Sequence, residues 1–301
     1  MLILPDINEI TYFSTQLKSY RTDNDHNNKI REKIIETMSY IDDEYFNDPT
    51  YGTSWRDLKT SFDLKMNELC NNYHTYKIKH KAGRKFNYDF INSFYDSSNV
   101  LIKNVKLEFK FNASSIDQSP QFVSPMRPSQ YLSQSFEEFY YTNYLSNLFN
   151  KYQLSIPDLD TYIKTIHKTN PKCMNEAQLL YYQGCKTSSK YTETERAINF
   201  YNDANIVSRE CIYNFITNTD LDIDKLNQYL IQSQEDKIYL LYKNNSFNLQ
   251  YSNSDDYIIE NYEKQPDNFR YLANSKSNKK IKILLRWKNG NGIAFPAFQI
   301  S

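Results

Sequence analysis

Apolar residues recur every three or four positions over most of the first 75 residues and again between residues 129 and 232, the spacing typical of one face of an α-helix. The first helix is expected to begin after Asp6, an acidic residue suited to cap a helix N-terminus. Polar residues 23–28 separate it from the next helix. The same spacing predicts further helices over residues 29–46, 55–74, 129–150, 156–167, 175–182, 192–217 and 220–232.

Other segments alternate apolar and polar residues, which predicts β-strands. Between residues 84 and 110, two alternating runs flank the turn-like segment 95–99 and therefore predict a β-hairpin. Successive side chains of a strand point to opposite faces. In the second run one face is apolar and the other is charged, with Leu107, Phe109 and Phe111 against Lys106, Glu108 and Lys110. The first run places Asp89 where it can approach the charged face of the second.

Two further hairpins are predicted near the end of the chain, from residues 237–242 with 247–251 and from residues 280–287 with 293–300. The fold class expected from these elements is α/β, in the mixed α+β sense, with a helical insertion and C-terminal β-hairpins. Four regions follow, namely N-terminal helices over 1–75, a core over 76–150, a helical subdomain over 151–235 and a β-hairpin region over 236–301.

The predicted hairpin gathers a chemically suggestive set of side chains. If its strands pair, Asp89 approaches Glu108 and Lys110. Two carboxylates close together suit a divalent cation such as Mg²⁺, which prefers a few carboxylate ligands and substrate phosphates. A neighbouring lysine can orient or help deprotonate an attacking water. The pattern therefore predicts metal-dependent hydrolysis of a phosphodiester bond, with Asp89 and Glu108 as metal ligands and Lys110 beside the water.

Asp89 followed by Glu108-x-Lys110 resembles the D…(D/E)xK signature of the PD-(D/E)XK, or restriction-endonuclease-like, nuclease superfamily. Residues 81–132 also resemble nuclease-like proteins of large DNA viruses. The resemblance implies a restriction-endonuclease-like central mixed sheet flanked by helices, and a Mg²⁺-dependent endonuclease, a hydrolase acting on DNA, in which Mn²⁺ can substitute. Its action would be site-specific, of the restriction or homing kind. Tyr88 stands before Asp89, where the family name has proline.

Further residues are candidates for the site. Glu68, on the helix before the core, would be an additional metal ligand by the same resemblance, although a surface glutamate on an amphipathic helix is the simpler and favoured explanation. The candidates for contacting nucleic acid are Arg84, Lys85, Gln118, Gln121 and Arg127. The two glutamines are also suited to turns and caps, and an arginine in a loop is usually solvated.

Composition changes this picture in one respect. Lysine plus arginine equals aspartate plus glutamate at 36 each, so the net charge of the whole chain does not indicate nucleic-acid binding. Between residues 77 and 110, however, eight basic residues face three acidic ones, a surplus of five positive charges around the candidate site. A positive neighbourhood is what a polyphosphate substrate favours.

Several classes of site are not indicated by the sequence. The four cysteines show no CxxC pairing, and Cys70 with His74 has no second pair to complete a zinc site. No segment approaches the roughly 18 apolar residues of a membrane span, and the N-terminus lacks a secretion-signal pattern. We therefore expect an intracellular protein of the cytoplasm or nucleus, within a host cell if it is viral, with DNA rather than a membrane as its partner.

Other functions are compatible with the same residues. The hairpin could be an ordinary amphipathic one whose charged residues form a solvated cross-strand ladder. The chain could be a non-catalytic module that binds nucleic acid or protein on a nuclease-like fold, or a nuclease directed at RNA. A cutter of double strands would need two active sites, which predicts a homodimer.

Overall fold

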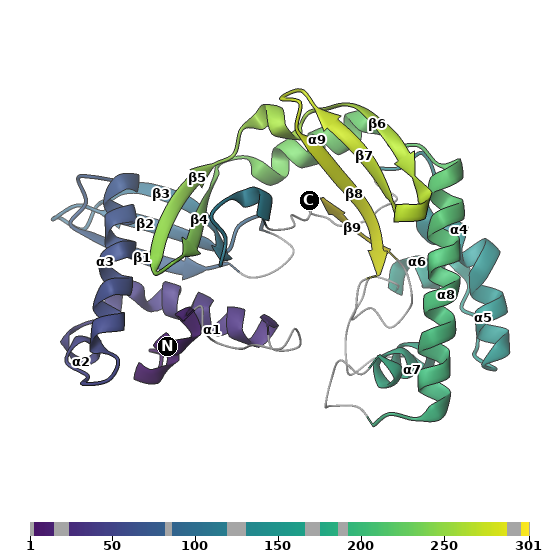
Figure 1. The fold of residues 1–301 in the computed structure, drawn as a ribbon, viewed down its shortest axis with the longest axis horizontal. Coiled ribbons are helices and arrows are strands. Elements are labelled where there is room, and N and C mark those ends of the chain that lie inside the picture. Colours follow the sequence, from purple (N-terminus) through teal and green to yellow (C-terminus); the bar gives the residue numbers. More distant parts are fainter. Residues whose placement is uncertain are drawn as a thin grey trace. The chain divides into compact units, whose positions relative to one another are not determined.

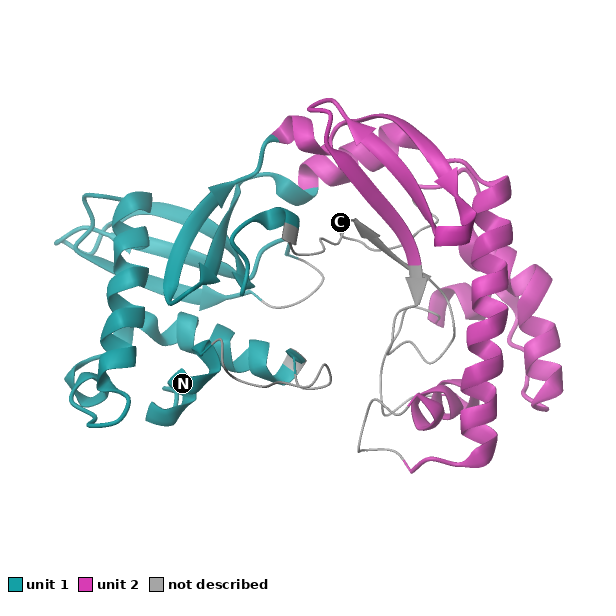
Figure 2. Ribbon diagram, in the orientation of Figure 1, with its two compact units in different colours: residues 1–119, 233–253 teal, residues 120–232, 254–301 magenta. Residues whose placement is uncertain are grey.

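The structure is a computed structural model that describes residues 3–14, 24–81, 86–118, 131–165, 175–185, 192–287 and 296–300. It divides into two compact units, of which unit 1 comprises residues 1–119 and 233–253 and unit 2 comprises residues 120–232 and 254–301 (Figure 2). Each unit is therefore built from two separate stretches of the chain. The candidate site lies in unit 1.

Unit 1 is built around a five-stranded sheet in the order β1-β2-β3-β4-β5 (Figure 1). Its strands are β1 (Thr75–His80), β2 (Phe90–Tyr95), β3 (Leu101–Phe111), β4 (Lys237–Lys243) and β5 (Ser246–Tyr251). All neighbours are antiparallel except β3 and β4, which are parallel. A parallel pair needs a long crossover connection, and unit 2 supplies most of the residues between β3 and β4.

The helices of unit 1 cover one face of this sheet. They are α1 (Asn24–Thr37), α2 (Asp43–Phe46) and α3 (Gly52–Leu69), with short 3-10 helices over Ile7–Phe13 and Met38–Tyr40. A further 3-10 helix, Ile116–Gln118, lies on the other face, where Ile116 packs with Tyr239 and Leu241 of β4. Fully buried side chains of α1 and α3 share one core with alternate residues of the strands, among them Ile34, Phe62, Phe90, Phe94 and Leu107. The residues between these strand positions, including Glu108 and Lys110, point to the opposite face.

Unit 2 consists of helices and a four-stranded antiparallel sheet in the order β6-β7-β8-β9. The helices are α4 (Phe136–Tyr140), a π-helical turn (Tyr141–Leu145), α5 (Ser146–Lys151), α6 (Leu159–Thr165), α7 (Glu176–Gly184), α8 (Glu195–Asn218) and α9 (Ile223–Gln234). The strands are β6 (Ile259–Gln265), β7 (Arg270–Ser275), β8 (Lys280–Trp287) and β9 (Pro296–Ile300), and a 3-10 turn occupies Ser254–Tyr257 and another Pro266–Asn268. A second core, rich in tyrosine and phenylalanine, joins these helices to the sheet.

The fold class is confirmed as mixed α/β, but the predicted region boundaries differ from the two units. Residues 237–251 extend the first sheet, whereas residues 280–300 pair within the second, so the expected C-terminal region over 236–301 is divided. The last part of the expected core over 76–150 belongs to unit 2, because the apolar side chains of α4 and α5 pack in the core of that unit. Strand pairing decides the first difference and helix packing decides the second, and a local sequence pattern specifies neither. Within the described residues, no helix has the length and hydropathy needed to cross a bilayer.

Candidate functional site

The hairpin of β2 and β3 fixes Asp89 beside Glu108. Phe90 lies opposite Leu107 in the antiparallel register, which places Asp89, the residue before β2, opposite Glu108. The amide of Asp89 donates a hydrogen bond to the carbonyl oxygen of Leu107 (2.9 Å), and Asp89 Oδ2 accepts one from the amide of Phe109 (2.8 Å). The carboxylate is therefore held by the backbone of the strand that carries the rest of the predicted signature.

Glu108 and Lys110 complete the cluster from β3. They lie two residues apart, so both side chains leave the same face of the strand. Lys110 Nζ lies 2.5 Å from Glu108 Oε1, and the side chains of Lys110 and Glu108 are only 21% and 17% exposed. The structure thus brings together the three residues that the sequence predicts as the catalytic set.

The close approach of these groups shifts the pKa values of both Asp89 and Lys110. Burial, followed by repulsion from Glu108, raises the pKa of Asp89 to about 7, against the opposing pull of Lys110 and the Phe109 amide. Burial lowers the pKa of Lys110, but attraction and hydrogen bonding to Glu108 more than offset it, so that the pKa is raised overall. Perturbation of this kind, by burial and a specific charge partner, is typical of functional sites.

A second lysine reaches the site from β4. Lys237 Nζ lies 3.6 Å from Glu108 Oε2 and donates a hydrogen bond to the carbonyl oxygen of Asn87 (3.0 Å), and its side chain is only 6% exposed. Burial lowers its pKa, while Glu108 acts in the opposite direction. Each oxygen of Glu108 thus faces a different ammonium group. Sequence reasoning missed Lys237, because the whole helical segment separates it from Lys110.

Replacing Lys237 with methionine is expected to lower the free energy of unfolding by about 1–3 kcal/mol, because Glu108 and the Asn87 carbonyl lose a buried charged donor. Methionine keeps most of the apolar stem, so the charge is what the change removes. Lys106→Met is the matched control, since Lys106 lies beside Lys237 in the β3–β4 register and its side chain is 39% exposed. Urea unfolding should show less than about 0.5 kcal/mol for the control. Equal losses for the two variants would contradict the buried role of Lys237.

The acidic residue that approaches the site from a helix is Glu32 of α1, not Glu68. Glu32 Oε2 lies 3.2 Å from His80 Nε2, at the end of β1, and Glu32 is close enough to raise the pKa of both Asp89 and Lys110. The sequence placed Glu32 on a predicted helix but contained no signal that this helix would meet the end of β1.

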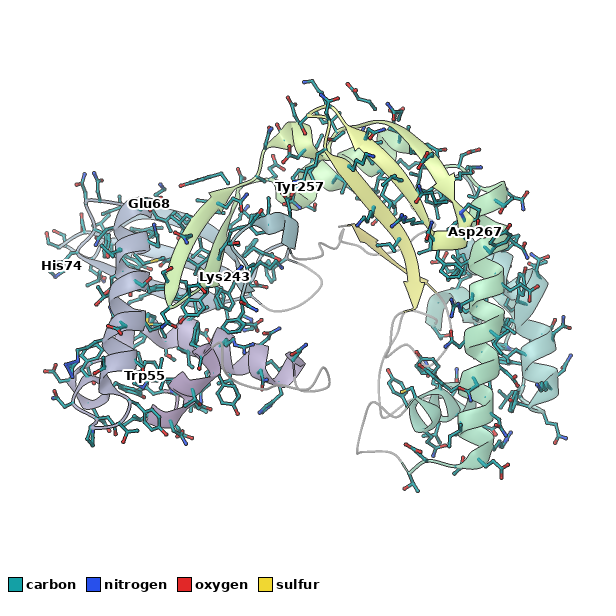
Figure 3. All side chains as sticks on the ribbon, in the orientation of Figure 1. Trp55, Glu68, His74, Lys243, Tyr257 and Asp267 are labelled. Atoms are coloured by element: carbon teal, nitrogen blue, oxygen red, sulfur yellow. The ribbon has the colours of Figure 1, made fainter. Side chains whose placement is uncertain are left out.

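Glu68 lies near the end of α3, opposite the end that carries Trp55 (Figure 3). Its side chain is 49% exposed and pairs with Lys65 at 2.9 Å. The neighbouring Leu69 carbonyl accepts a hydrogen bond from Lys103 Nζ at 2.8 Å. Lys103 precedes Glu108 on β3 by roughly 16 Å at about 3.3 Å per residue. The structure therefore does not bring Glu68 to Asp89 and Glu108.

The expected contacts to nucleic acid cannot be placed in the same way. Arg84, Lys85, Gln121 and Arg127 lie outside the described residues. Gln118 ends the 3-10 helix Ile116–Gln118, and its side chain lies outside the described part.

The residues fit a divalent cation in chemistry and charge. Asp89 and Glu108 offer carboxylate oxygens. Burial and then repulsion from Glu108 raise the pKa of Asp89, and a cation would relieve that repulsion. Among the described residues, no group of three or more histidine, cysteine, aspartate or glutamate side chains is arranged to hold a metal ion. A cation here would therefore rely on few protein ligands, as Mg²⁺ commonly does, with water and phosphate completing its shell.

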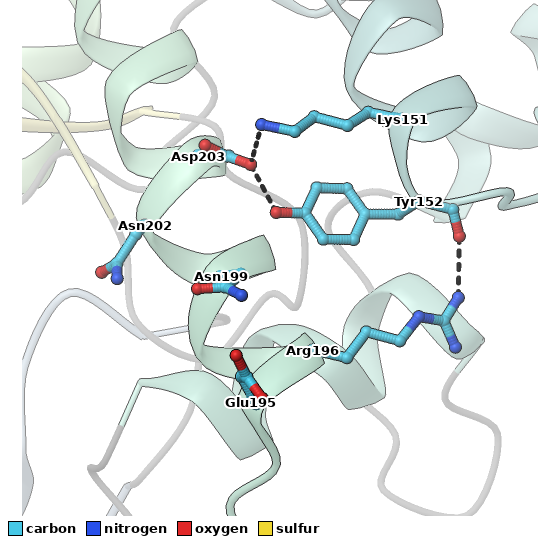
Figure 4. Close-up of a pocket in the computed structure, with 7 residues that line it drawn as sticks. All are labelled: Lys151, Tyr152, Glu195, Arg196, Asn199, Asn202 and Asp203. Carbon is cyan, nitrogen blue, oxygen red and sulfur yellow. Dashed lines mark hydrogen bonds and ion pairs between the residues drawn. The ribbon is translucent and has the colours of Figure 1, made fainter.

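Unit 2 contains a separate polar depression of about 600 Å³ beside α8 (Figure 4). Asp203 accepts hydrogen bonds from the Tyr152 hydroxyl and pairs with Lys151 at 2.6 Å, while Arg196 donates to the Tyr152 carbonyl at 2.7 Å. Lys151, Asp203 and Arg196 are thus engaged in local contacts. Burial acts to raise the pKa of Asp203, but hydrogen bonds from Lys151 and Tyr152 more than offset it, so the pKa is lowered and the carboxylate is held in its charged form. No protein-family model and no curated protein matches this sequence.

Proposed function

We propose that this protein is a metal-dependent endonuclease that hydrolyses phosphodiester bonds of DNA. The observation that supports it is the meeting of Asp89, Glu108 and Lys110 on one face of the sheet, with the pKa of Asp89 raised to about 7 by burial and by Glu108. Two like-charged groups held together in a partly buried place lower the stability of the fold. Proteins retain such arrangements mainly at functional sites, where the chemistry requires them.

In this proposal Asp89 and Glu108 hold Mg²⁺ or Mn²⁺, and the bound cation supplies charge stabilisation at the phosphate. Lys110 orients the attacking water. Its raised pKa keeps the side chain protonated at neutral pH, which favours its action as a hydrogen-bond donor to that water over action as the base. Lys237, on the neighbouring strand β4, contacts the second oxygen of Glu108 and so positions this carboxylate.

Site-specific cleavage of both strands of a duplex would require two copies of the site, hence a homodimer. The surplus of positive charge over residues 77–110 supports a nucleic-acid partner. We place the protein inside the cell, in the cytoplasm or nucleus, where DNA is available.

A cleavage assay tests the proposal. Supercoiled plasmid DNA is expected to be nicked or linearised in Mg²⁺ or Mn²⁺ and to remain intact in chelator. Asp89→Ala should abolish the reaction while leaving the circular dichroism spectrum unchanged. Metal-dependent cleavage by Asp89→Ala protein would refute the assignment. An RNA of matched sequence in the same assay distinguishes a DNA enzyme from one directed at RNA.

A non-catalytic nucleic-acid-binding module is the second candidate. It is favoured by the small number of metal-binding side chains that the described residues gather. Binding of DNA that is insensitive to chelator, with no cleavage in any divalent cation, would support this candidate instead.

A further inference from the structure

The face of the first sheet that points away from α1 and α3 carries a group of lysines beside the candidate site. Lys79 lies opposite Ile91, and Ile91 lies opposite Lys106, so these positions form one row across β1, β2 and β3. Lys77 lies two residues before Lys79 on β1. Alternation places all of them on the same face as Glu108 and Lys110. Lys77 and Lys79 are exposed, and the side chain of Lys106 is 39% exposed.

Aromatic rings accompany these lysines. Lys77 Nζ lies 5.4 Å from the ring centre of Tyr95, and Lys106 Nζ lies 5.7 Å from that of Tyr88. Lys81 Nζ lies 5.3 Å from the ring centre of Phe86. We call these six residues, together with Lys79, the lysine–aromatic surface. Two of its rings, Phe86 and Tyr88, lie 5.5 Å apart, Phe86 is 37% exposed, and Tyr88 directly precedes Asp89.

We infer that the lysine–aromatic surface binds a single-stranded polynucleotide and leads it to Asp89 and Glu108, an inference that rests on the proposed nuclease function. Lysines attract the phosphates of either a single strand or a duplex. Exposed rings add affinity only for bases whose faces are free, and each stacked base contributes about 1–3 kcal/mol with little dependence on its identity. In a duplex the base faces are covered by their neighbours, so the rings favour an unpaired strand.

The spacing of the charges suits a short segment of backbone. Strands lie about 4.8 Å apart, so Lys79 and Lys106 are separated by roughly 10 Å across β2, about the length of three nucleotides of a stacked strand. Acidic groups that the described residues place on this side include Asp89, Glu108 and Asp236. Asp236 pairs with Lys106 at 3.7 Å, but its side chain is 74% exposed, and such an exposed pair is readily exchanged for a phosphate.

Binding in chelator separates this inference from catalysis. The probes are a fluorescent oligothymidylate, an RNA of matched length and a DNA duplex of the same length, each titrated with the full-length protein. The single strands should bind more tightly than the duplex, and the DNA and RNA arms identify the preferred sugar. Tyr88→Leu, which retains apolar bulk without the ring, should weaken single-strand binding about fivefold or more. Lys77→Ala with Lys79→Ala should reduce the dependence of log affinity on log salt by about 1.4.

Lys65→Ala and Tyr40→Ala are the matched controls, because both residues lie on the helical side of unit 1 and Tyr40 is 47% exposed. Neither should alter binding. Equal or tighter binding of the duplex, or unchanged single-strand binding by both test variants, would overturn the inference even if metal-dependent cleavage is found. Single-strand binding that depends on Tyr88 without any cleavage would instead refute the nuclease proposal alone.

Discussion

Lys110→Ala is expected to slow metal-dependent DNA cleavage by about 10²- to 10⁴-fold, the range found when a group that positions or protonates a reacting atom is removed. The structural reason for this effect is the position of the Lys110 side chain. Lys110 Nζ contacts Glu108, and Glu108 faces Asp89, so the ammonium group lies next to any cation that these carboxylates hold. The rate of plasmid nicking at saturating Mn²⁺ measures the effect.

The same variant should retain metal binding, since alanine removes a positive charge from the neighbourhood of the two carboxylates. Titration with Mn²⁺, followed by calorimetry, should give an affinity at least equal to that of the unmodified protein. Lys65→Ala serves as the control for the loss of a lysine from the same unit, because its ion pair with Glu68 lies on α3. Nicking by Lys110→Ala protein at the rate of the control would remove Lys110 from the mechanism.

The hairpin of the site could be predicted from the sequence, because its information is local. The alternation of Val105, Leu107 and Phe109 fixes which face of β3 is buried, and the turn before it fixes the direction of pairing. The short strand β1 was missed. Its buried residues Tyr76 and Ile78 follow directly after the apolar stripe of α3 and were too few to establish a change of period.

The edge strand β6 was missed for another reason. In β6 only the first residue is buried, so the strand shows no clean alternation, and its role becomes visible only when β7 pairs with it. Tertiary pairing overrides local pattern in such edge strands.

The parts of the site that come from distant segments could not be predicted. Lys237 arrives because β4 pairs in parallel with β3, and a local pattern does not specify which strand another will join. Glu32 arrives because α1 packs against β1, through an ion pair with His80. The sequence held one signal for Lys237, which is a charged residue at the start of an otherwise apolar strand. Because a lysine is rarely buried without a charge partner, its position in a buried strand predicts such a partner.

Asp89→Asn is expected to stabilise the protein above neutral pH in the absence of metal, while abolishing cleavage. The pKa of Asp89 is about 7 in the folded protein and 3.8 as the reference value. Between these values the folded state binds a proton that the unfolded state has released. The free energy of unfolding therefore falls as pH rises through this window and levels off above it, by up to about 4 kcal/mol in total.

Asparagine does not titrate, and its side-chain oxygen can still accept the hydrogen bond from the Phe109 amide. The variant should thus match the unmodified protein at about pH 2.5, where Asp89 is protonated in both states, and exceed it in stability at about pH 8. Urea unfolding in chelator at both values measures the difference. Asp57→Asn, an exposed change on α3, should differ from the unmodified protein by less than about 0.5 kcal/mol at either pH.

Addition of Mn²⁺ at the higher pH should reverse the order, because a cation bound between Asp89 and Glu108 stabilises only the protein that retains both carboxylates. An Asp89→Asn protein that is less stable than the unmodified one at high pH without metal would show that Asp89 strengthens the fold as a charged group. The two carboxylates would then be a structural pair rather than a site whose repulsion awaits a cation.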